Sequence, residues 1–184
     1  MRQPLRLHPD SRSVAVTSID VEIARPRAGS LGLSYIVTGQ MSSIRMPSVA
    51  ANARSDGLWR HTCFEAFIRA ASDIGYYELN FSPSGQWAAY QFSGYRSGMR
   101  VASEITGVPI ELRSSPDRCV LRASLDPDRF AGLPPDRAWR IGLSAVIEDT
   151  NGEISYWALA HPPGKPDFHH ANGFAYEISP AVKS

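Results

Sequence analysis

The stretch "YYELNFSPSGQWAAYQF", Tyr76–Phe92, decides the fold. Two runs that are rich in aromatic residues flank "SPSG", a composition typical of a tight turn, and the pattern predicts a β-hairpin. The segment "VPIELRSSPDRCVLRASL" repeats this pattern with a turn at "SSPD". A third pair, "WRIGLSAVIEDTNGEISYWAL", turns at "DTNG", where Asn151-Gly152 suits a positive φ. The sequence therefore predicts antiparallel strands joined by short turns.

Similar runs recur along the rest of the chain, and helical periodicity is scarce. The segment "LDPDRFAGLPPDRA" allows one helical turn at most, because its prolines prevent a longer helix. This spacing favours an all-β fold, a single antiparallel β-sandwich domain spanning residues 1–184. The strands are expected near Val14–Ala24, Leu31–Gly39, Cys63–Ala70, Tyr76–Ser82, Gln86–Ser93, Arg100–Ile105, Val108–Ser114, Arg118–Ser124, Ala138–Glu148, Ser155–Ala160 and Phe174–Ile178.

The composition excludes several classes of protein. The chain has 184 residues, of which 43% are apolar, so it can form one well-packed core. The net charge is +1, and the basic residues are spread along the chain without the stripe that nucleic-acid binding requires. No run approaches the roughly 20 apolar residues of a membrane span. We therefore expect no nucleic-acid partner and no membrane partner, and the oligomeric state stays open.

The N-terminal segment and the cysteines bear on the compartment. The segment "MRQPLRLHPDSRSVAV" has no apolar core of the kind found in signal peptides, so a soluble cytoplasmic protein is expected. Cys63 and Cys119 are far apart in the sequence and lie in apolar, strand-like contexts. We predict that both are buried free thiols.

Several expected strands carry polar residues on one face. Strand alternation places Glu65 on one face of "RHTCFEAFI", and Glu78 and Asn80 on one face of "YYELNFS". Such a face is either a solvated outer surface or a concave polar surface for a ligand. Sugars suit the second alternative, because acids and amides bind hydroxyl groups and flat rings pack on C–H faces. The candidate platforms are Trp59, Trp87 and Trp157, each of which could instead lie in the core.

The segment "WALAHPPGKPDFHH", Trp157–His170, holds three of the five histidines. Its prolines predict a stiff loop, and the adjacent His169 and His170 would point apart in extended backbone. Asp167 allows a metal site, but zinc sites show tighter ligand spacings than His161 and His169 offer. We therefore predict the rim of a binding pocket and no metal site.

Catalytic motifs are weak. No GxSxG motif, phosphate loop or dinucleotide fingerprint is present. His61 and Cys63 lie on one strand face and could pair, although a structural cysteine is the preferred interpretation. Glu65 and Glu78 could act as the acid and base of a glycosidase. The prediction is nevertheless that the protein is not an enzyme.

Three long blocks carry a resemblance to a known family: "DGLWRHTCFEAFIR", "YYELNFSPSGQWAAYQFSGYRSGM" and "SYWALAHPPGKPDFHH". Together they resemble bacterial DOMON-like domain proteins, which look related to family 9 carbohydrate-binding modules. The resemblance spans residues from Asp56 to Phe174 and implies a jelly-roll type β-sandwich of about ten strands. It also implies a non-catalytic module that binds a carbohydrate or a similar polyhydroxylated ligand. The ligand-binding residues expected on this basis are His61, Glu65, Glu78, Asn80, Trp87, Arg140 and Trp157, with His161 and His169 on the rim.

The resemblance leaves two alternative functions open. Haem-binding relatives use a methionine and a histidine as axial ligands, and both residue types are present here. Spacing selects no pair among the candidates, so haem is ranked below a sugar and no cofactor is predicted. The second alternative is a protein–protein interaction domain that uses a sheet edge or the aromatic face. The haem-ligand candidates are Met41, Met46 and Met99, with His61, His161 or His169.

Overall fold

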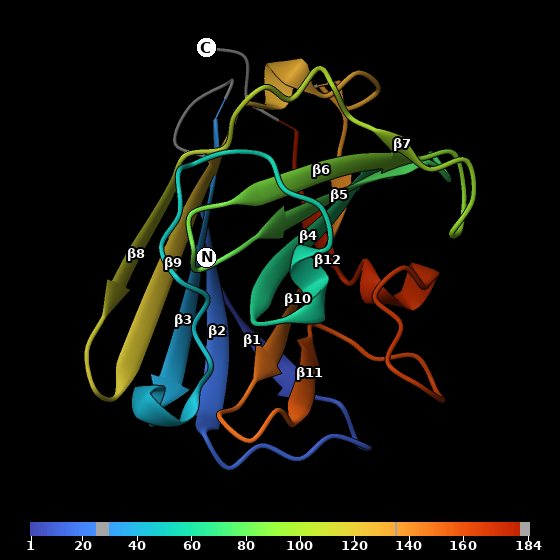
Figure 1. Cartoon of the computed structure of the whole chain (residues 1–184). Coiled ribbons are helices and arrows are strands. Elements are labelled where there is room, and N and C mark those ends of the chain that lie inside the picture. Colours follow the sequence, from blue (N-terminus) through green and yellow to red (C-terminus); the bar gives the residue numbers. More distant parts are fainter. Residues whose placement is uncertain (25–29, 135, 181–184) are drawn as a thin grey trace.

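Antiparallel pairing joins the strands of the computed structural model into one strongly curved path (Figure 1). The structure describes residues 1–24, 30–134 and 136–180. Within these residues there are four single-turn 3₁₀ helices: η1 (Met41–Ser43), η2 (Leu58–Arg60), η3 (Pro127–Arg129) and η4 (Ala171–Gly173). The twelve strands of the described residues are β1 (Arg2–Leu7), β2 (Val16–Ala24), β3 (Leu31–Gly39), β4 (Cys63–Ala70), β5 (Tyr76–Phe81), β6 (Trp87–Phe92), β7 (Arg100–Val101), β8 (Ile110–Ser114), β9 (Arg118–Leu125), β10 (Trp139–Glu148), β11 (Ile154–Ala158) and β12 (Tyr176–Ile178).

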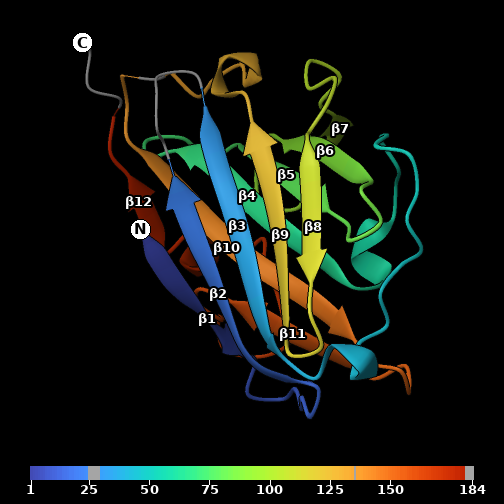
Figure 2. The same ribbon diagram turned by 90° about the vertical axis from the view of Figure 1, so that its left-hand side faces the viewer.

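The path folds over into two facing layers (Figure 2). One layer, called the β4 layer here, has the order β7-β6-β5-β4-β10-β11, with β12 also paired to β10. The other, the β3 layer, has the order β2-β3-β9-β8. Strand β1 joins them, because Arg2–Leu5 pairs with β2 while Arg6 and Leu7 pair with β11. The prediction of an all-β antiparallel sandwich is confirmed.

The main core fills the space between the layers. Strand alternation turns Phe64 of β4, Leu79 of β5 and Leu143 of β10 inward, where each is buried. Tyr35 of β3 packs its ring 5.0 Å from that of Phe64 and donates a hydrogen bond from its hydroxyl to the backbone oxygen of Glu65 at 2.6 Å. One face of each central strand thus packs in the main core. A binding site on the β4 layer would therefore lie on its opposite, outer face.

The three predicted hairpins are present. The turn at "SPSG" joins β5 to β6, "SSPD" joins β8 to β9, and "DTNG" joins β10 to β11. The helical turn allowed in "LDPDRFAGLPPDRA" is η3, and both cysteines are buried free thiols as predicted. In the part of the chain that the structure describes, no helix has the length and apolarity that crossing a membrane needs.

Strand β1 was not predicted from the sequence. Strand β1 holds Pro4, which has no backbone N–H to donate, and the segment alternates weakly because only Leu5 is buried. The expected strand Arg100–Ile105 is also shorter, since only Arg100–Val101 forms β7. Neither difference changes the architecture.

Candidate functional site

The outer face of the β4 layer is buried rather than open to water. The register places Glu78 of β5 opposite both Phe67 of β4 and Tyr90 of β6, and all three side chains point away from the main core. Phe67 and Tyr90 belong to a second apolar cluster. The lack of a side chain at Gly142 of β10 lets η4 pack closely on the sheet. A Cβ at this position would lie 2.9 Å from the backbone oxygen of Gly173 in η4. Loops therefore pack closely over this face.

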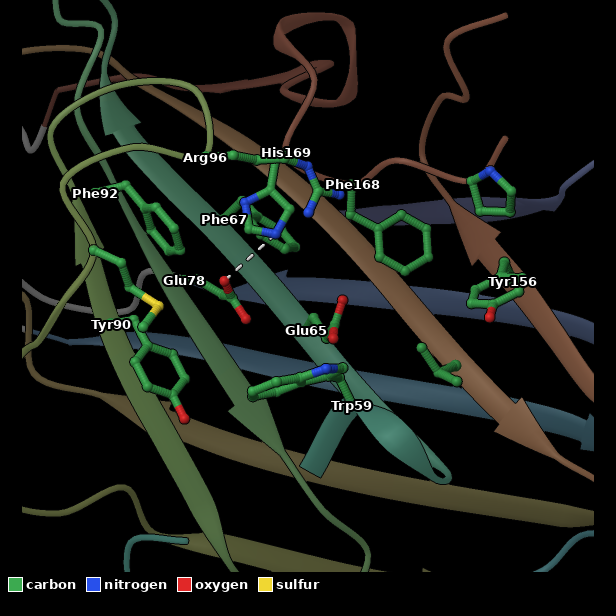
Figure 3. A pocket seen from close by; sticks show the side chains of 13 residues that line it. Trp59, Glu65, Phe67, Glu78, Tyr90, Phe92, Arg96, Tyr156, Phe168 and His169 are labelled. Carbon is green, nitrogen blue, oxygen red and sulfur yellow. Dashed lines mark ion pairs between the residues drawn. The ribbon is translucent and has the colours of Figure 1, made fainter. Parts of the chain in front are cut away.

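A pocket of about 410 Å³ opens between these loops and the sheet (Figure 3). Helix η2 contributes Trp59, and the loop between β6 and β7 contributes Arg96 and Met99. The segment from His161 to His170, which we call the rim segment, contributes three side chains, including His169. The residues lining the pocket are Trp59, Glu65, Phe67, Glu78, Tyr90, Phe92, Arg96, Met99, Val146, Tyr156, Pro166, Phe168 and His169.

Two acidic side chains form the floor of the pocket. Figure 3 shows the carboxyl groups of Glu65 and Glu78 pointing into the space between the rings of Trp59 and His169. Ser144 donates a hydrogen bond to Glu65 Oε2 at 3.1 Å, and Asn80 donates one to Glu78 Oε1 at 2.8 Å. Both carboxyl groups are thus held in place by neighbours on the same sheet face.

Burial makes both acids hard to ionise. Burial, and then the charge of Glu78, raises the pKa of Glu65 to about 8, despite the hydrogen bond from Ser144 and the positive charge of Arg96. Burial also raises the pKa of Glu78, against the hydrogen bond from Asn80 and the charge of Arg96. Two acids that share a poorly hydrated site do not both ionise readily. The pair therefore retains a proton at neutral pH.

His169 faces the acids as a neutral ring. Burial, with help from the charge of Arg96, lowers the pKa of His169 to about 4. Its Nδ1 lies 2.8 Å from the hydroxyl of Tyr76, which in turn accepts a hydrogen bond from the backbone N–H of Arg96. The Tyr76 hydroxyl is thus shared between His169 and Arg96, and Nε2 of His169 lies 3.7 Å from Glu78 Oε2. The contact drawn in Figure 3 joins a neutral imidazole to the acid at neutral pH.

A polar clamp holds the rim segment against the loop between β6 and β7. Asp167 accepts hydrogen bonds from the hydroxyl of Tyr95 at 2.6 Å and from the guanidinium of Arg96 at 2.8 Å. It also accepts one from the backbone N–H of His169 at 3.1 Å. Arg96 adopts a left-handed backbone with φ of 50°, and its side chain reaches the rim segment at Asp167. Asp167 thus positions both Arg96 and His169 at the pocket.

Trp59 supplies an accessible aromatic surface. Its residue is 41% exposed, and its ring meets that of Tyr90 edge to face at 6.1 Å. The hydroxyl of Tyr90 donates to Asp56, which directs the polar end of that ring away from the acids. A flat apolar wall therefore stands beside the two carboxyl groups.

Comparison with solved structures finds sandwiches of the same shape. A candidate carbohydrate-binding protein from Bacteroides uniformis matches with a TM-score of 0.69 at 14% identity, over 94% of this chain and 83% of that chain. A family 9 carbohydrate-binding module from Caldicellulosiruptor kristjanssonii in complex with cellotriose has a TM-score of 0.60 at 10% identity, over 100% of this chain and 84% of that chain. A family 9 module from the same organism in complex with glucose has a TM-score of 0.56 at 11% identity, over 95% and 81%.

These proteins share their fold with this chain. At identities of 10–14% the match does not show which residues of this chain correspond to their binding residues. No family model matches the sequence. A search of curated proteins also finds no match. The expected similarity to family 9 carbohydrate-binding modules is thus confirmed for the architecture, and membership of the DOMON-like family stays a prediction.

Four of the nine expected ligand-binding residues lie at or just behind the pocket. Glu65, Glu78 and His169 line it. Asn80 is fully buried, holds Glu78 and accepts a weak hydrogen bond from the thiol of Cys63 at 3.7 Å. It is a positioning residue rather than a contact.

Two of the three tryptophans predicted as platforms belong to the core, while the third, Trp59, lines the pocket. Trp87 and Trp157 are 4% and 5% exposed, and both pack in the main cluster between the layers. Trp87 pairs with Phe81, an inward-facing residue of β5. Because neighbouring residues on paired strands share a face, Trp87 points away from the pocket. Trp87 and Trp157 therefore do not line the pocket, contrary to the prediction.

The other three expected residues lie elsewhere. His61 is exposed and contacts Glu148 through Nδ1 at 2.7 Å. Arg140 is exposed on β10 and forms an ion pair with Glu177 of β12 at 3.0 Å. His161 donates from Nε2 to the backbone oxygen of Arg6 at 2.8 Å, so it anchors the start of the rim segment to β1. None of the three lines the pocket.

The structure brings one methionine–histidine pair of the haem alternative together, since Met99 and His169 line the same pocket. Met41 lies in the main core, and Met46 packs against it. His169 nevertheless has both ring nitrogens directed at protein groups, Tyr76 and Glu78. The floor of the pocket also carries the carboxyl groups of Glu65 and Glu78, and the apolar ring of a haem would have to lie against them. These residues fit haem poorly.

Metal and thiol chemistry find little support in the described residues. No group of three or more His, Cys, Asp or Glu side chains there is arranged to hold a metal ion. Cys63 is fully buried and donates toward Asn80, while His61 is turned to Glu148, so the two do not pair. Burial raises the pKa of the Cys63 thiol well above its ordinary value, which makes it a poor nucleophile.

Several pocket residues were not foreseen. Tyr90 and Phe92 could have been found from the hairpin, because a turn centred on Ser84 places Tyr90 opposite Glu78. Arg96 lies in a loop whose path no local pattern encodes. The other pocket residues that were not predicted are Phe67, Val146, Tyr156, Pro166 and Phe168. Trp59 was predicted as an aromatic platform, and Met99 only as a candidate haem ligand.

Proposed function

We propose that the pocket on the outer face of the β4 layer binds a carbohydrate, without catalysing a reaction. The observation that carries this proposal is the accessible ring of Trp59 beside the carboxyl groups of Glu65 and Glu78. A pyranose presents apolar C–H groups on its faces and hydroxyl groups around its edge. Rings bind the former by stacking, and carboxyl groups bind the latter by hydrogen bonds.

The size and setting of the pocket support the same ligand class. Its volume of about 410 Å³ lies within the range of roughly 300–1,000 Å³ that small-molecule sites occupy. The clamp at Asp167 orders the rim before a ligand arrives, which lowers the entropy that binding must supply. Structural neighbours of this chain include modules in complex with cellotriose and with glucose.

Isothermal titration calorimetry with a panel of neutral mono- and oligosaccharides, and with their amino derivatives, tests the proposal. We expect at least one sugar to bind the wild type, and Trp59→Ala to weaken that binding about tenfold, in line with the stacking energy of aromatic pairs. The matched control is Ile74→Ala, which removes another exposed apolar side chain outside this pocket. A panel in which no sugar binds would overturn the proposal.

The same samples test for catalysis. Glu65 and Glu78 face one pocket, so the acid–base alternative predicts the release of nitrophenol from aryl glycosides. We expect no release above that of a Glu65→Gln, Glu78→Gln double variant. Turnover that this double variant lacks would replace the binding function with a hydrolytic one.

A further inference from the structure

We infer that the pocket prefers an amine-bearing sugar, with the ammonium group placed between the carboxyl groups of Glu65 and Glu78. This inference rests on the proposed carbohydrate-binding function and deepens it. It depends on the charges that face the pocket, on the free oxygen atoms of the two acids, and on the aromatic walls around them.

The charges around the pocket leave the two acids without a free cation. Arg96 lines the pocket, and its positive charge lowers the pKa of both acids. Its guanidinium is nevertheless held in an ion pair with Asp167 at 2.8 Å, so it is not free to move between the two carboxyl groups. His169 is neutral at neutral pH. The other lining residues are aromatic or aliphatic. The remaining charge in the pocket is therefore the negative charge of the Glu65–Glu78 pair.

Each acid keeps one oxygen atom available to a ligand. Ser144 binds Glu65 Oε2, and no hydrogen bond within the described residues engages Glu65 Oε1. Asn80 binds Glu78 Oε1, while Glu78 Oε2 lies 3.7 Å from His169, beyond a hydrogen bond. Glu65 is 3% exposed and lines the pocket, so its free oxygen is directed into that space.

An ammonium group matches this pair better than a hydroxyl group does. It has three donors and no acceptor, so it can bind both carboxylates at once. A hydroxyl group has one donor and can bridge the pair only while the pair keeps its proton. The ammonium ion instead replaces that proton, which passes to the buffer, and two carboxylates then face one cation. The Trp59 and Tyr90 rings favour a cation further, because aromatic faces attract positive charge.

The inference is tested by calorimetry on three matched pairs: glucose with glucosamine, galactose with galactosamine, and mannose with mannosamine. For at least one pair at pH 7 and low salt, we expect the amino sugar to bind at least tenfold more tightly. Titrations in two buffers of different ionisation enthalpy should show proton release with the amino sugar only. N-acetylglucosamine, which carries an uncharged amide, should bind no better than glucose.

Isosteric variants connect the preference to the two acids. Glu65→Gln and Glu78→Gln should each reduce the preference to about twofold or less, while thermal unfolding checks that the variants remain folded. Glu111→Gln is the matched control, since Glu111 is an exposed acid on β8, far from the pocket in the fold. If sugars bind with no amine preference in any pair, the inference fails and the proposed function stands. If no sugar binds, both fail.

Discussion

The outer faces of the two layers differ in burial, although both layers are built from alternating strands. On β9 of the β3 layer, residues alternate between exposed and buried, as expected of a sheet with one face in water. On β4 and β5, every residue except Arg69 is buried, on both faces. The difference comes from the loops that cover the β4 layer, including η2, η4 and the rim segment. A covered outer face that also holds acids distinguishes the candidate site from ordinary sheet surface.

The largest expected effect is a difference in stability between substitutions on the outer face of the β4 layer and substitutions on the outer face of the β3 layer. Phe67→Ala should reduce the free energy of unfolding by about 3 kcal/mol, because it leaves a cavity in the second apolar cluster. Phe67 is 1% exposed there, and its ring contacts those of Tyr76, His169 and Phe174. Arg122→Ala, on the exposed face of β9, should change the same quantity by less than about 0.5 kcal/mol. Denaturant unfolding measures both, and equal losses would contradict the contrast.

The next effect is a pH dependence of stability that arises from the site. The pKa of Glu65 is about 8 in the folded protein and about 4.3 in an unfolded chain, so between these values the folded state holds a proton that the unfolded state lacks. Stability therefore falls as the pH rises through this window. His169 has the opposite effect on stability, because its pKa of about 4 in the folded protein lies below the unfolded value of about 6.5. The stability that His169 contributes therefore rises with pH between these values.

Unfolded histidines still hold protons at pH 6.5, and burial lowers the pKa of His161 as it does that of His169. Burial also raises the pKa of Cys63 and Cys119, which adds a fall in stability toward pH 8. The slope due to Glu65 is therefore the difference between the wild type and a Glu65 variant.

Unfolding measured from pH 6.5 to 8 checks this dependence. The wild type should lose up to about 1.4 kcal/mol more per pH unit than Glu65→Gln does, which is the value for one retained proton. The exposed acid Glu111 on β8 provides the control, and Glu111→Gln should keep the wild-type slope. Curves of equal slope for the wild type and Glu65→Gln would mean that Glu65 ionises normally.

The smallest expected effect concerns the polar clamp at Asp167, which holds the rim segment over the pocket. Asp167→Ala should speed hydrogen exchange at the backbone amide of His169, because it removes the oxygen atom to which that amide donates. Global stability should change by less than about 1 kcal/mol, since the ion pair with Arg96 is partly exposed. Glu177→Ala breaks another exposed pair, with Arg140, and should leave exchange in the rim segment unchanged. Unaltered exchange at His169 in Asp167→Ala would exclude Asp167 as the positioning residue.

The sequence predicted the fold well because the fold is built mainly from local hairpins. Adjacent strands such as β5 and β6 are encoded by a turn and two alternating runs, which can be recognised without tertiary information. Strand β1 could not be found in this way, because its pairing with β11 joins distant parts of the chain. Its single buried residue, Leu5, is too weak a local signal.

The site was predicted in part, for a related reason. Alternation assigned Glu65 and Glu78 to the correct face, since it needs only the strand itself. Trp87 was chosen for its residue type, and the hairpin register would instead have selected Tyr90 as the neighbour of Glu78. Trp59 and Arg96 lie outside the central strands, and their approach to the acids follows from packing that no spacing rule describes.

Strand β1 also has a consequence for the kinetics of folding. Its pairs Arg6–Ala158 and Leu7–Trp157 are contacts of very high sequence separation, and they join the two layers at the hinge of the path. During synthesis on a ribosome, β1 emerges long before β11 exists, so the sheet cannot close until nearly all of the chain is available. Until then Arg6 and Leu7 of β1 lack their partners on β11, and this strand edge is open to other nascent chains. We expect slow refolding, and yields that improve on dilution, as is typical of topologies with high contact order.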